Sequence, residues 1–265
     1  MFELNKDNYG LLRKLVSEVA CNMLMPRSVI EQHVDGKVYV DSLEKPQTYY
    51  LVHPYGMTWL CGKSNNETFN QWLLDYFAGH SFAREKDEWL QAYPRAWDVL
   101  LKQLIDKQLA TCYTRVNLKF NPDKFYENYN PIEKDQYEII STPAEMLFEL
   151  KGSVVPKDYW KTPALALEMG KAFTVLIDGK PASTAFTSAR HDDQLEIGIE
   201  TSLEYHGKGL AYLVCAKLIE YCLDHNLEPV WACRYENTAS LNLSKKLGFT
   251  EVLRMPYYHI PKSSM

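Results

Sequence analysis

Residues 195–211 have the sequence LEIGIETSLEYHGKGLA, in which an apolar strand leads into a glycine-rich turn and then a helix. Leu195–Thr201 alternates between apolar side chains and polar or small ones, as a strand with one buried face does. Gly207 and Gly209 flank Lys208, and helical apolar spacing starts directly after them. The stretch therefore predicts an α/β (α+β) fold with a candidate anion site where the strand meets the helix.

The start of the predicted helix, Gly209–His225, suits a diphosphate. Its first N–H groups lack partners within the helix, and the helix dipole adds partial positive charge. Glycine lets an anion approach the backbone because it has no Cβ. The chain lacks the P-loop pattern GxxxxGK[ST] and the full GxGxxG dinucleotide spacing. Taken alone, GKG is also explained by an ordinary tight turn.

A second motif, NTASLNLSKKLGF, follows one predicted strand later, at residues 237–249. Asn237 is a predicted helix cap, and Gly248 is a predicted left-handed stop before Phe249. Together the motifs resemble the GNAT N-acetyltransferase superfamily, whose diphosphate loop has the pattern Q/R-x-x-G-x-G/A and whose later motif has N-x-x-A/S-x-x-L-Y-x-x-x-G-F. The matching residues are His206, Gly207, Lys208, Gly209, Leu210 and Ala211 in the first motif, and Asn237, Ser240, Leu243, Ser244, Gly248 and Phe249 in the second.

More narrowly, EIGIET (196–201), Trp231-Ala232-Cys233 and LSKKLGF (243–249) resemble the zwittermicin-resistance-type branch of that superfamily. The resemblance implies a GNAT acyl-CoA N-acyltransferase fold, with a mixed central sheet flanked by helices, in residues 131–265. Residues 1–130 would form a smaller α+β domain. One interpretation is that this domain is a degenerate GNAT-like half that shapes the acceptor site. We expect the boundary in the polar, proline-interrupted stretch 121–135.

Hydrophobic periodicity predicts the other elements. In the second region these are strands at 137–140, 172–178, 182–188, 229–234 and 249–254 and helices at 143–150, 157–169 and 238–247. In the first region they are a helix at 9–23, a hairpin at 48–61, a helix capped by Asn66 and ending at Gly79, a helix from Pro94 and a strand at 110–120.

The resemblance implies acetyl-CoA as cosubstrate and direct attack of an amine on its thioester. By analogy with the family, the backbone at two strand residues would hold the pantetheine arm and the glycine loop would hold the diphosphate. The implied cofactor-binding residues are Ile199, Thr201, His206, Gly207, Lys208, Gly209, Leu210, Ala211 and Asn237.

An amine substrate arrives largely protonated, so the reaction needs a base. Strand alternation places Glu196, Gly198 and Glu200 on one face. The two glutamates are about 13 Å apart along the strand, too far to share a proton. Glu196, acting through a water, is the first candidate for the base and Glu200 the second. For each, the alternative is a solvated strand glutamate.

The chain departs from the family pattern at two positions. His206 replaces the usual Gln or Arg, which matters little if backbone N–H groups bind the diphosphate. Ser244 stands where many members have a tyrosine that protonates the departing thiolate. A thiol pKa of about 8.5 makes the thiolate a tolerable leaving group. The general acid is left open between Tyr235, Tyr257 and water.

Composition excludes several classes of partner. The formal charge of the 265 residues is -5 and the pI about 5.8, so no positive field is available to collect nucleic acid or anionic lipid. No apolar run approaches the about 20 residues of a membrane span, and we expect a cytoplasmic protein. The six cysteines form no CxxC pair and the seven histidines no HExxH spacing, so no metal is expected.

The predicted function is acetyl transfer to a primary amine of a small molecule, with an antibiotic-like compound favoured by the branch resemblance and a polyamine or a protein amine as alternatives. A catalytically inactive CoA-binding regulator or scaffold is the rival from another class, and a protein that binds a different nucleotide diphosphate is a second rival. The sequence leaves monomer and homodimer both open.

Overall fold

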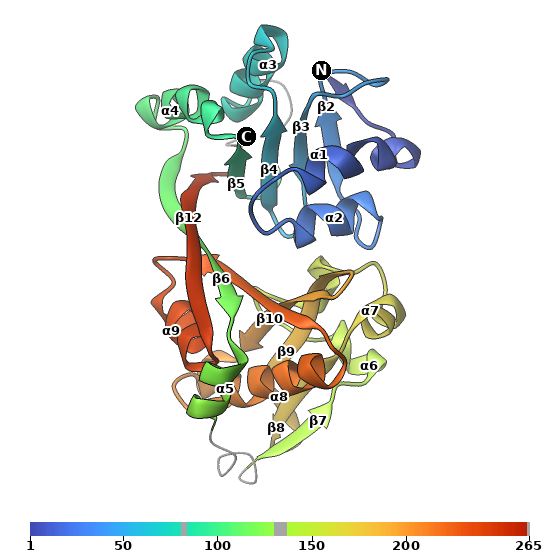
Figure 1. Ribbon diagram of the computed structural model, residues 1–265, viewed down its shortest axis with the longest axis vertical. Coiled ribbons are helices and arrows are strands. Elements are labelled where there is room, and N and C mark those ends of the chain that lie inside the picture. The colour runs from blue at the N-terminus through green and yellow to red at the C-terminus, as the bar shows by residue number, and fades with distance from the viewer. Residues whose placement is uncertain (81–83, 130–136, 264–265) are drawn as a thin grey trace. The chain divides into compact units, whose positions relative to one another are not determined.

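The computed structural model describes residues 1–80, 84–129 and 137–263, which form two compact units (Figure 1). Unit 1 contains Met1–Arg115, Arg234–Glu236 and Arg254–Met265, and unit 2 contains Val116–Cys233 and Asn237–Leu253. The expected boundary between residues 130 and 131 lies outside the described residues. The units divide earlier, after Arg115, because a single long strand contributes residues to both.

The chain repeats one order of elements, once for each unit: strand, two helices, three strands, helix, strand, helix, strand. The last strand of each repeat contributes residues to both units. In unit 1 these are β1 (Phe2–Glu3), α1 (Arg13–Ser17), α2 (Leu24–Ile30), β2 (Lys37–Val40), β3 (Thr48–Val52), β4 (Met57–Gly62), α3 (Glu67–Phe77), β5 (Glu88–Tyr93), α4 (Asp98–Asp106) and β6 (Thr111–Phe120). In unit 2 they are β7 (Glu138–Ser141), α6 (Ala144–Leu147), α7 (Pro163–Met169), β8 (Ala172–Ile177), β9 (Lys180–His191), β10 (Gln194–Thr201), α8 (Leu210–Asp224), β11 (Glu228–Arg234), α9 (Thr238–Lys246) and β12 (Phe249–Ile260). Helix α5 (Pro122–Asn128) follows β6, and the 3-10 helices are η1 (Lys6–Leu12), η2 (Arg95–Trp97), η4 (Pro156–Asp158) and η5 (Leu203–Tyr205).

Each unit has a mixed sheet. The strand order is β1-β2-β3-β4-β5-β12 in unit 1 and β12-β6-β11-β10-β9-β8-β7 in unit 2. The fourth and fifth strands of each repeat pair in parallel, β4 with β5 and β10 with β11. Neighbouring pairs such as β8 with β9 and β9 with β10 are antiparallel. A parallel pair needs a crossover, and in unit 2 helix α8 supplies it.

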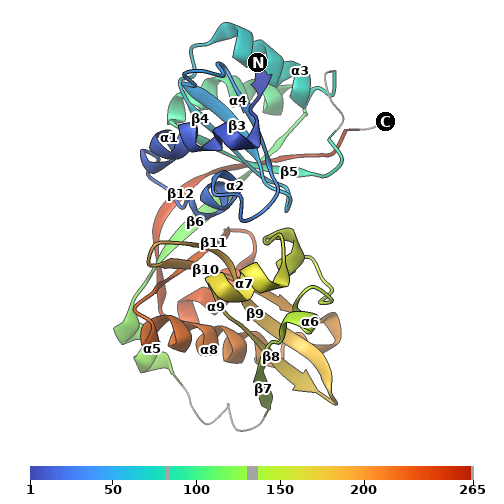
Figure 2. The same ribbon diagram turned by 90° about the vertical axis from the view of Figure 1, so that its right-hand side faces the viewer.

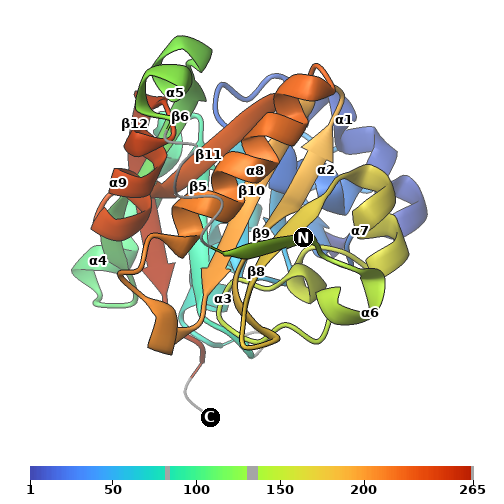
Figure 3. The ribbon, with the colours of Figure 1, turned by 90° about the horizontal axis from the view of Figure 1, so that it is seen from below.

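Helix α8 covers one face of β8, β9 and β10, and α6 and α7 lie on the other side of these strands (Figure 3). Its buried residues are Leu210, Leu213, Val214, Cys215, Ala216, Leu218, Ile219 and Cys222. They pack against Leu195 and Ile197 of β10. The first turn of α8 is therefore held in a fixed position at the end of β10.

In unit 1, helices α3 and α4 pack on one face of the sheet, and α1 and α2 lie on the other (Figure 2). A buried carboxylate lies between the sheet and helix α3. Tyr50 and Tyr76 both donate hydrogen bonds to this carboxylate, which belongs to Glu88. Burial raises the pKa of Glu88 above its ordinary value, although the two hydroxyls oppose the shift.

Several predicted elements form, and others differ for local reasons. The hairpin at 48–61 and the helix capped by Asn66 are present as β3, β4 and α3. The predicted helix at 157–169 is split, because Thr162 caps α7 and Pro163 occupies its first position. The stretch expected to be a linker begins with α5, whose Phe125 is fully buried. No helix in the described part of the chain has the length and apolar content of a membrane span.

Candidate functional site

Strands β10 and β11 separate partway along their length. Their parallel register runs from Gln194 opposite Glu228 to Glu196 opposite Val230. Pairing of β10 with β9 shifts by a bulge between Glu196 and Ile197 and then continues to Thr201. Beyond the bulge, β10 therefore pairs with β9 and no longer with β11. The predicted pantetheine contacts at Ile199 and Thr201 would form along the edge of β10 that faces β11.

Two left-handed glycines lead from β10 into α8. Gly207 has φ +76° and Gly209 has φ +79°, a region that residues with a Cβ rarely occupy. Within the described residues, and apart from the adjoining residues of the chain, no heavy atom lies within 4 Å of the Cβ that either glycine would carry. Gly209 is the N-cap residue and has no side chain with which to cap the helix. The turn thus leaves space for a ligand directly at the positive end of α8.

The corresponding helix of unit 1 begins differently. Helix α3 follows β4 as α8 follows β10, but its N-cap residue Asn66 accepts a hydrogen bond at 3.1 Å from the N–H of Phe69. That side chain covers a donor that an anion would need. The start of α8 therefore has no side-chain cap, whereas a side chain caps the start of α3.

Two polar side chains of the loop have defined contacts. Nε2 of His206 lies 2.8 Å from the carbonyl oxygen of Thr201, linking the end of β10 to the turn. Nζ of Lys208 lies 5.0 Å from the ring centroid of Tyr205. The imidazole at the family's Gln or Arg position thus orders the loop, and the lysine adds positive charge beside it.

Glu196 lies at the point where β10 and β11 separate. Its side chain is only 4% exposed, and it points away from the core that Leu195 and Ile197 form with α8. Oγ of Ser188, on β9, donates to the carbonyl oxygen of Glu196 at 3.0 Å. The alternative of a solvated strand glutamate is therefore wrong for this residue.

Glu200 has a different environment. Its Oε2 accepts hydrogen bonds from N–H and Oγ of Ser153, both at 3.1 Å, and from N–H of Val154 at 2.7 Å. A Cβ on Gly152 would lie 2.5 Å from this side chain. The carboxylate fastens the segment between α6 and η4 to β10, which favours Glu196 over Glu200 as the base.

The second motif forms helix α9. Oδ1 of Asn237 caps it, accepting from N–H of Ser240 at 3.1 Å, as predicted. Ser244 is fully buried, and its hydroxyl donates to the carbonyl oxygen of Leu241 at 2.8 Å. This serine is therefore not placed to protonate a leaving thiolate. The candidates for the general acid were Tyr235, Tyr257 and water. Both tyrosines belong to unit 1, and the general acid stays open.

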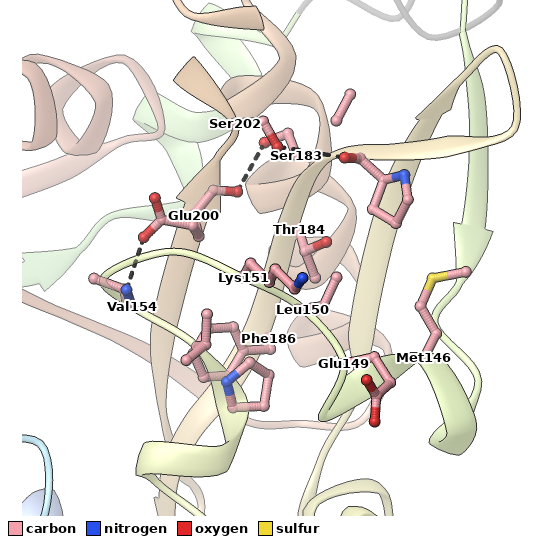
Figure 4. A pocket seen from close by; sticks show the side chains of 14 residues that line it. Met146, Glu149, Leu150, Lys151, Val154, Ser183, Thr184, Phe186, Glu200 and Ser202 are labelled. Carbon is pink, nitrogen blue, oxygen red and sulfur yellow. Dashed lines mark hydrogen bonds between the residues drawn. The ribbon is translucent and has the colours of Figure 1, made fainter. Parts of the chain in front are cut away.

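A pocket of about 360 Å³ lies beside Glu200, between the α6–η4 segment and strands β9 and β10 (Figure 4). The sequence offers no signal for it, because its walls come from three segments that are distant in the chain. Of the residues singled out from the sequence, Glu200 alone lines it.

The fold and the glycine-led helix define an acyltransferase of the GNAT class. The GNAT acetyltransferase family model matches residues 13–258, and the chain belongs to that family. It is 24% identical over 262 residues to the uncharacterized N-acetyltransferase YdfB of Bacillus subtilis, covering 97% of each chain.

Two solved structures share the fold. A GCN5-related N-acetyltransferase-like protein from Streptococcus suis superposes with a TM-score of 0.73 at 20% identity, over 97% of this chain and 99% of the other. A tandem GNAT protein from the clavulanic acid biosynthesis pathway superposes with a TM-score of 0.60 at 11% identity, over 98% and 97%. The predicted GNAT fold with its mixed sheet is confirmed. The zwittermicin-resistance-type branch stays a prediction.

Proposed function

We propose that this protein transfers the acetyl group of acetyl-CoA to a primary amine of a small molecule by direct attack. The observation that carries the proposal is the start of α8, led by two left-handed glycines with open space above them, at the end of a strand whose parallel partner separates. Oriented N–H groups favour a diphosphate there, and a separated strand edge offers backbone partners to an amide-containing arm.

Each proposed step depends on residues of unit 2. Backbone N–H groups of the Gly207–Ala211 loop hold the diphosphate, and the edge of β10 at Ile199 and Thr201 orients the pantetheine arm. Glu196 removes a proton from the amine, directly or through a water, as the new C–N bond forms. The C–S bond then breaks and releases CoA thiolate. With a thiol pKa of about 8.5, the thiolate leaves without an acid from Ser244.

The test compares two glycines with the same backbone strain. Gly209→Val places a side chain where the diphosphate would lie, so we expect acetyl-CoA binding in isothermal titration calorimetry to be lost. Gly179→Val is the matched control, because Gly179 has φ +73° and open space but lies in the β8–β9 turn. Equal loss of binding in both variants, or retained binding in Gly209→Val, would contradict the proposed site.

Burial of Ser244 favours one other candidate, a CoA-binding regulator without catalysis. Following free thiol while acetyl-CoA is mixed with a panel of amines separates the two functions. The panel includes antibiotic-like amines, polyamines and a peptide amine, matching the order of acceptors expected from the sequence. Thiol release above the spontaneous rate excludes the regulator, and binding without turnover across the panel favours it.

A further inference from the structure

We propose that the pocket beside Glu200 binds the apolar body of the acceptor, so that the preferred substrate is a monoamine with a compact hydrophobic group rather than a polyamine. This inference rests on the proposed function and specifies its substrate class. The pocket of about 360 Å³ is at the small end of the range for ligand sites, about 300–1,000 Å³, and suits a body the size of a single ring.

The lining is mainly apolar. Met146, Leu150 and Val154 contribute from the α6–η4 side, and Phe186 contributes from β9 (Figure 4). Pro156 also lines the pocket. The ring of Phe186 packs edge-on against that of Tyr159, with centroids 5.5 Å apart. An apolar lining of this kind gains free energy by burying hydrocarbon and disfavours the second or third ammonium group of a polyamine.

Two hydroxyl groups of the pocket, those of Ser183 and Thr184, form hydrogen bonds with residues outside it. The Thr184 hydroxyl lies 2.8 Å from that of Thr174, which in turn lies 2.7 Å from that of Thr142. Ser183 Oγ lies 2.7 Å from Thr201 Oγ1. Because these hydroxyl groups already have hydrogen-bond partners, an apolar ligand can cover them without leaving them unsatisfied.

The charged groups of the pocket are largely offset and give a polycation no concentrated negative charge to bind. Oε2 of Glu200 already accepts three hydrogen bonds from Ser153 and Val154, which offset its charge. Lys151 and Glu149 both line the same pocket and are both exposed, so their opposite charges offset one another. We infer that Glu200 is a positioning residue, which holds the α6–η4 segment in place as a wall of the pocket.

The pocket and the proposed base lie along one strip of β10. Glu196, Gly198 and Glu200 share a face, and a Cβ on Gly198 would lie 2.5 Å from the ring of Phe186. That ring therefore occupies the space left by the missing side chain, between Glu200 and Glu196. Glu196 is about 13 Å from Glu200 along the strand, so a compact acceptor held in the pocket would pass its proton to this base through water rather than directly.

The experiment uses the full chain with phenethylamine and ethylamine, which share an amine and differ in the apolar body. We expect a KM for phenethylamine lower than that for ethylamine by about tenfold or more, the range a hydrophobic pocket gives. Leu150→Trp, which fills the pocket, should raise the KM for phenethylamine by about tenfold or more. The KM values for ethylamine and for acetyl-CoA should stay unchanged in this variant. Met146→Trp fills the pocket from a second position in case the first variant does not fold.

The control is Val252→Trp, at a residue of β12 that is 61% exposed and does not line the pocket, and it should change neither KM. Similar KM values for the two amines, preference for spermidine, or a folded Leu150→Trp with unchanged KM would overturn the inference. Calorimetric binding of phenethylamine without acetyl-CoA provides a second readout. Binding that Leu150→Trp removes, together with no thiol release, would refute the acetyl transfer and leave the pocket in place.

Discussion

Glu196 and Glu200 are the same residue type on the same face of one strand, yet their surroundings differ. Glu196 is 4% exposed at the point where β10 leaves β11, whereas Glu200 is bonded to Ser153 and Val154. Oε2 of Glu200 accepts three hydrogen bonds and so holds the Ser153–Val154 segment to β10. We therefore keep Glu196 as the proposed base and propose a positioning role for Glu200.

Glu196→Gln tests the assignment of the base. Because the amide cannot accept the amine proton, we expect kcat to fall by about 100-fold or more. The Kd for acetyl-CoA, measured by calorimetry, should stay within experimental error. Glu200→Gln is the matched control, and it should change the KM for the amine more than kcat. Full activity of Glu196→Gln at every pH would show that another group is the base.

At the scale of elements, the starts of three helices differ in whether a side chain caps them. Asn66 and Asn237 cap α3 and α9 through their side chains, whereas α8 begins at Gly209. A side-chain cap satisfies the first turn from within the chain. A helix start led by glycine leaves those donors to a ligand.

Asn237→Ala and Asn66→Ala form a matched pair of cap deletions. Each should lower the free energy of unfolding by about 1 kcal/mol, because each loses one side-chain cap. If Asn237 also contacts acetyl-CoA through its amide nitrogen, as the family resemblance implies, only Asn237→Ala should weaken acetyl-CoA binding. Urea denaturation and calorimetry measure the two effects. Equal acetyl-CoA affinity in both variants would assign Asn237 to capping alone.

The turn between β3 and β4 carries a pH-dependent contribution to stability. Burial lowers the pKa of His53 from 6.5 to about 3, with nearby Lys86 as a smaller cause. Nδ1 of His53 accepts a hydrogen bond from N–H of Tyr55 at 3.1 Å. Between these two pKa values the unfolded chain binds a proton that the folded chain excludes. Stability is therefore complete above the unfolded pKa and is lost as the pH falls toward the folded pKa.

We expect His53→Asn to remove this dependence, because asparagine can accept the Tyr55 bond without titrating. From about pH 6 downward, the wild-type free energy of unfolding should fall relative to the variant by about 1.4 kcal/mol per pH unit. Urea denaturation across pH 4–8, an interval set by these pKa values, gives the comparison. Parallel pH profiles for the two proteins would mean that His53 is protonated in the folded state.

At the scale of the whole molecule, the two units share one order of elements, but only unit 2 has the proposed acetyl-CoA site. Unit 1 has Asn66 where unit 2 has Gly209. Calorimetry should therefore give one acetyl-CoA per chain rather than two. Acetyl-CoA at about 100 times its Kd should stabilise the protein by about 2.7 kcal/mol, or a rise in Tm of roughly 5–10 °C. ATP is the control, because it lacks the pantetheine arm, and an equal shift with ATP would favour a nucleotide site.

The sequence predicted the elements of unit 2 better than those of unit 1. β10, α8, β11 and α9 follow the predicted ranges closely, because each has clear periodicity and a glycine, asparagine or proline at an end. β2 and β5 were not predicted from the sequence, because both faces of these strands are buried and alternation is lost. The predicted helix at 9–23 is instead η1 followed by the short α1.

By itself, the sequence determined the class of fold and the position of the glycine-led helix, since these depend on local spacing and backbone preference over a few residues. Tertiary structure alone decided that Glu200 bonds the segment at Ser153 and that a pocket forms beside it. It also decided that Ser244 is buried. These outcomes depend on contacts between segments distant in the chain, and side-chain periodicity carries no record of such contacts.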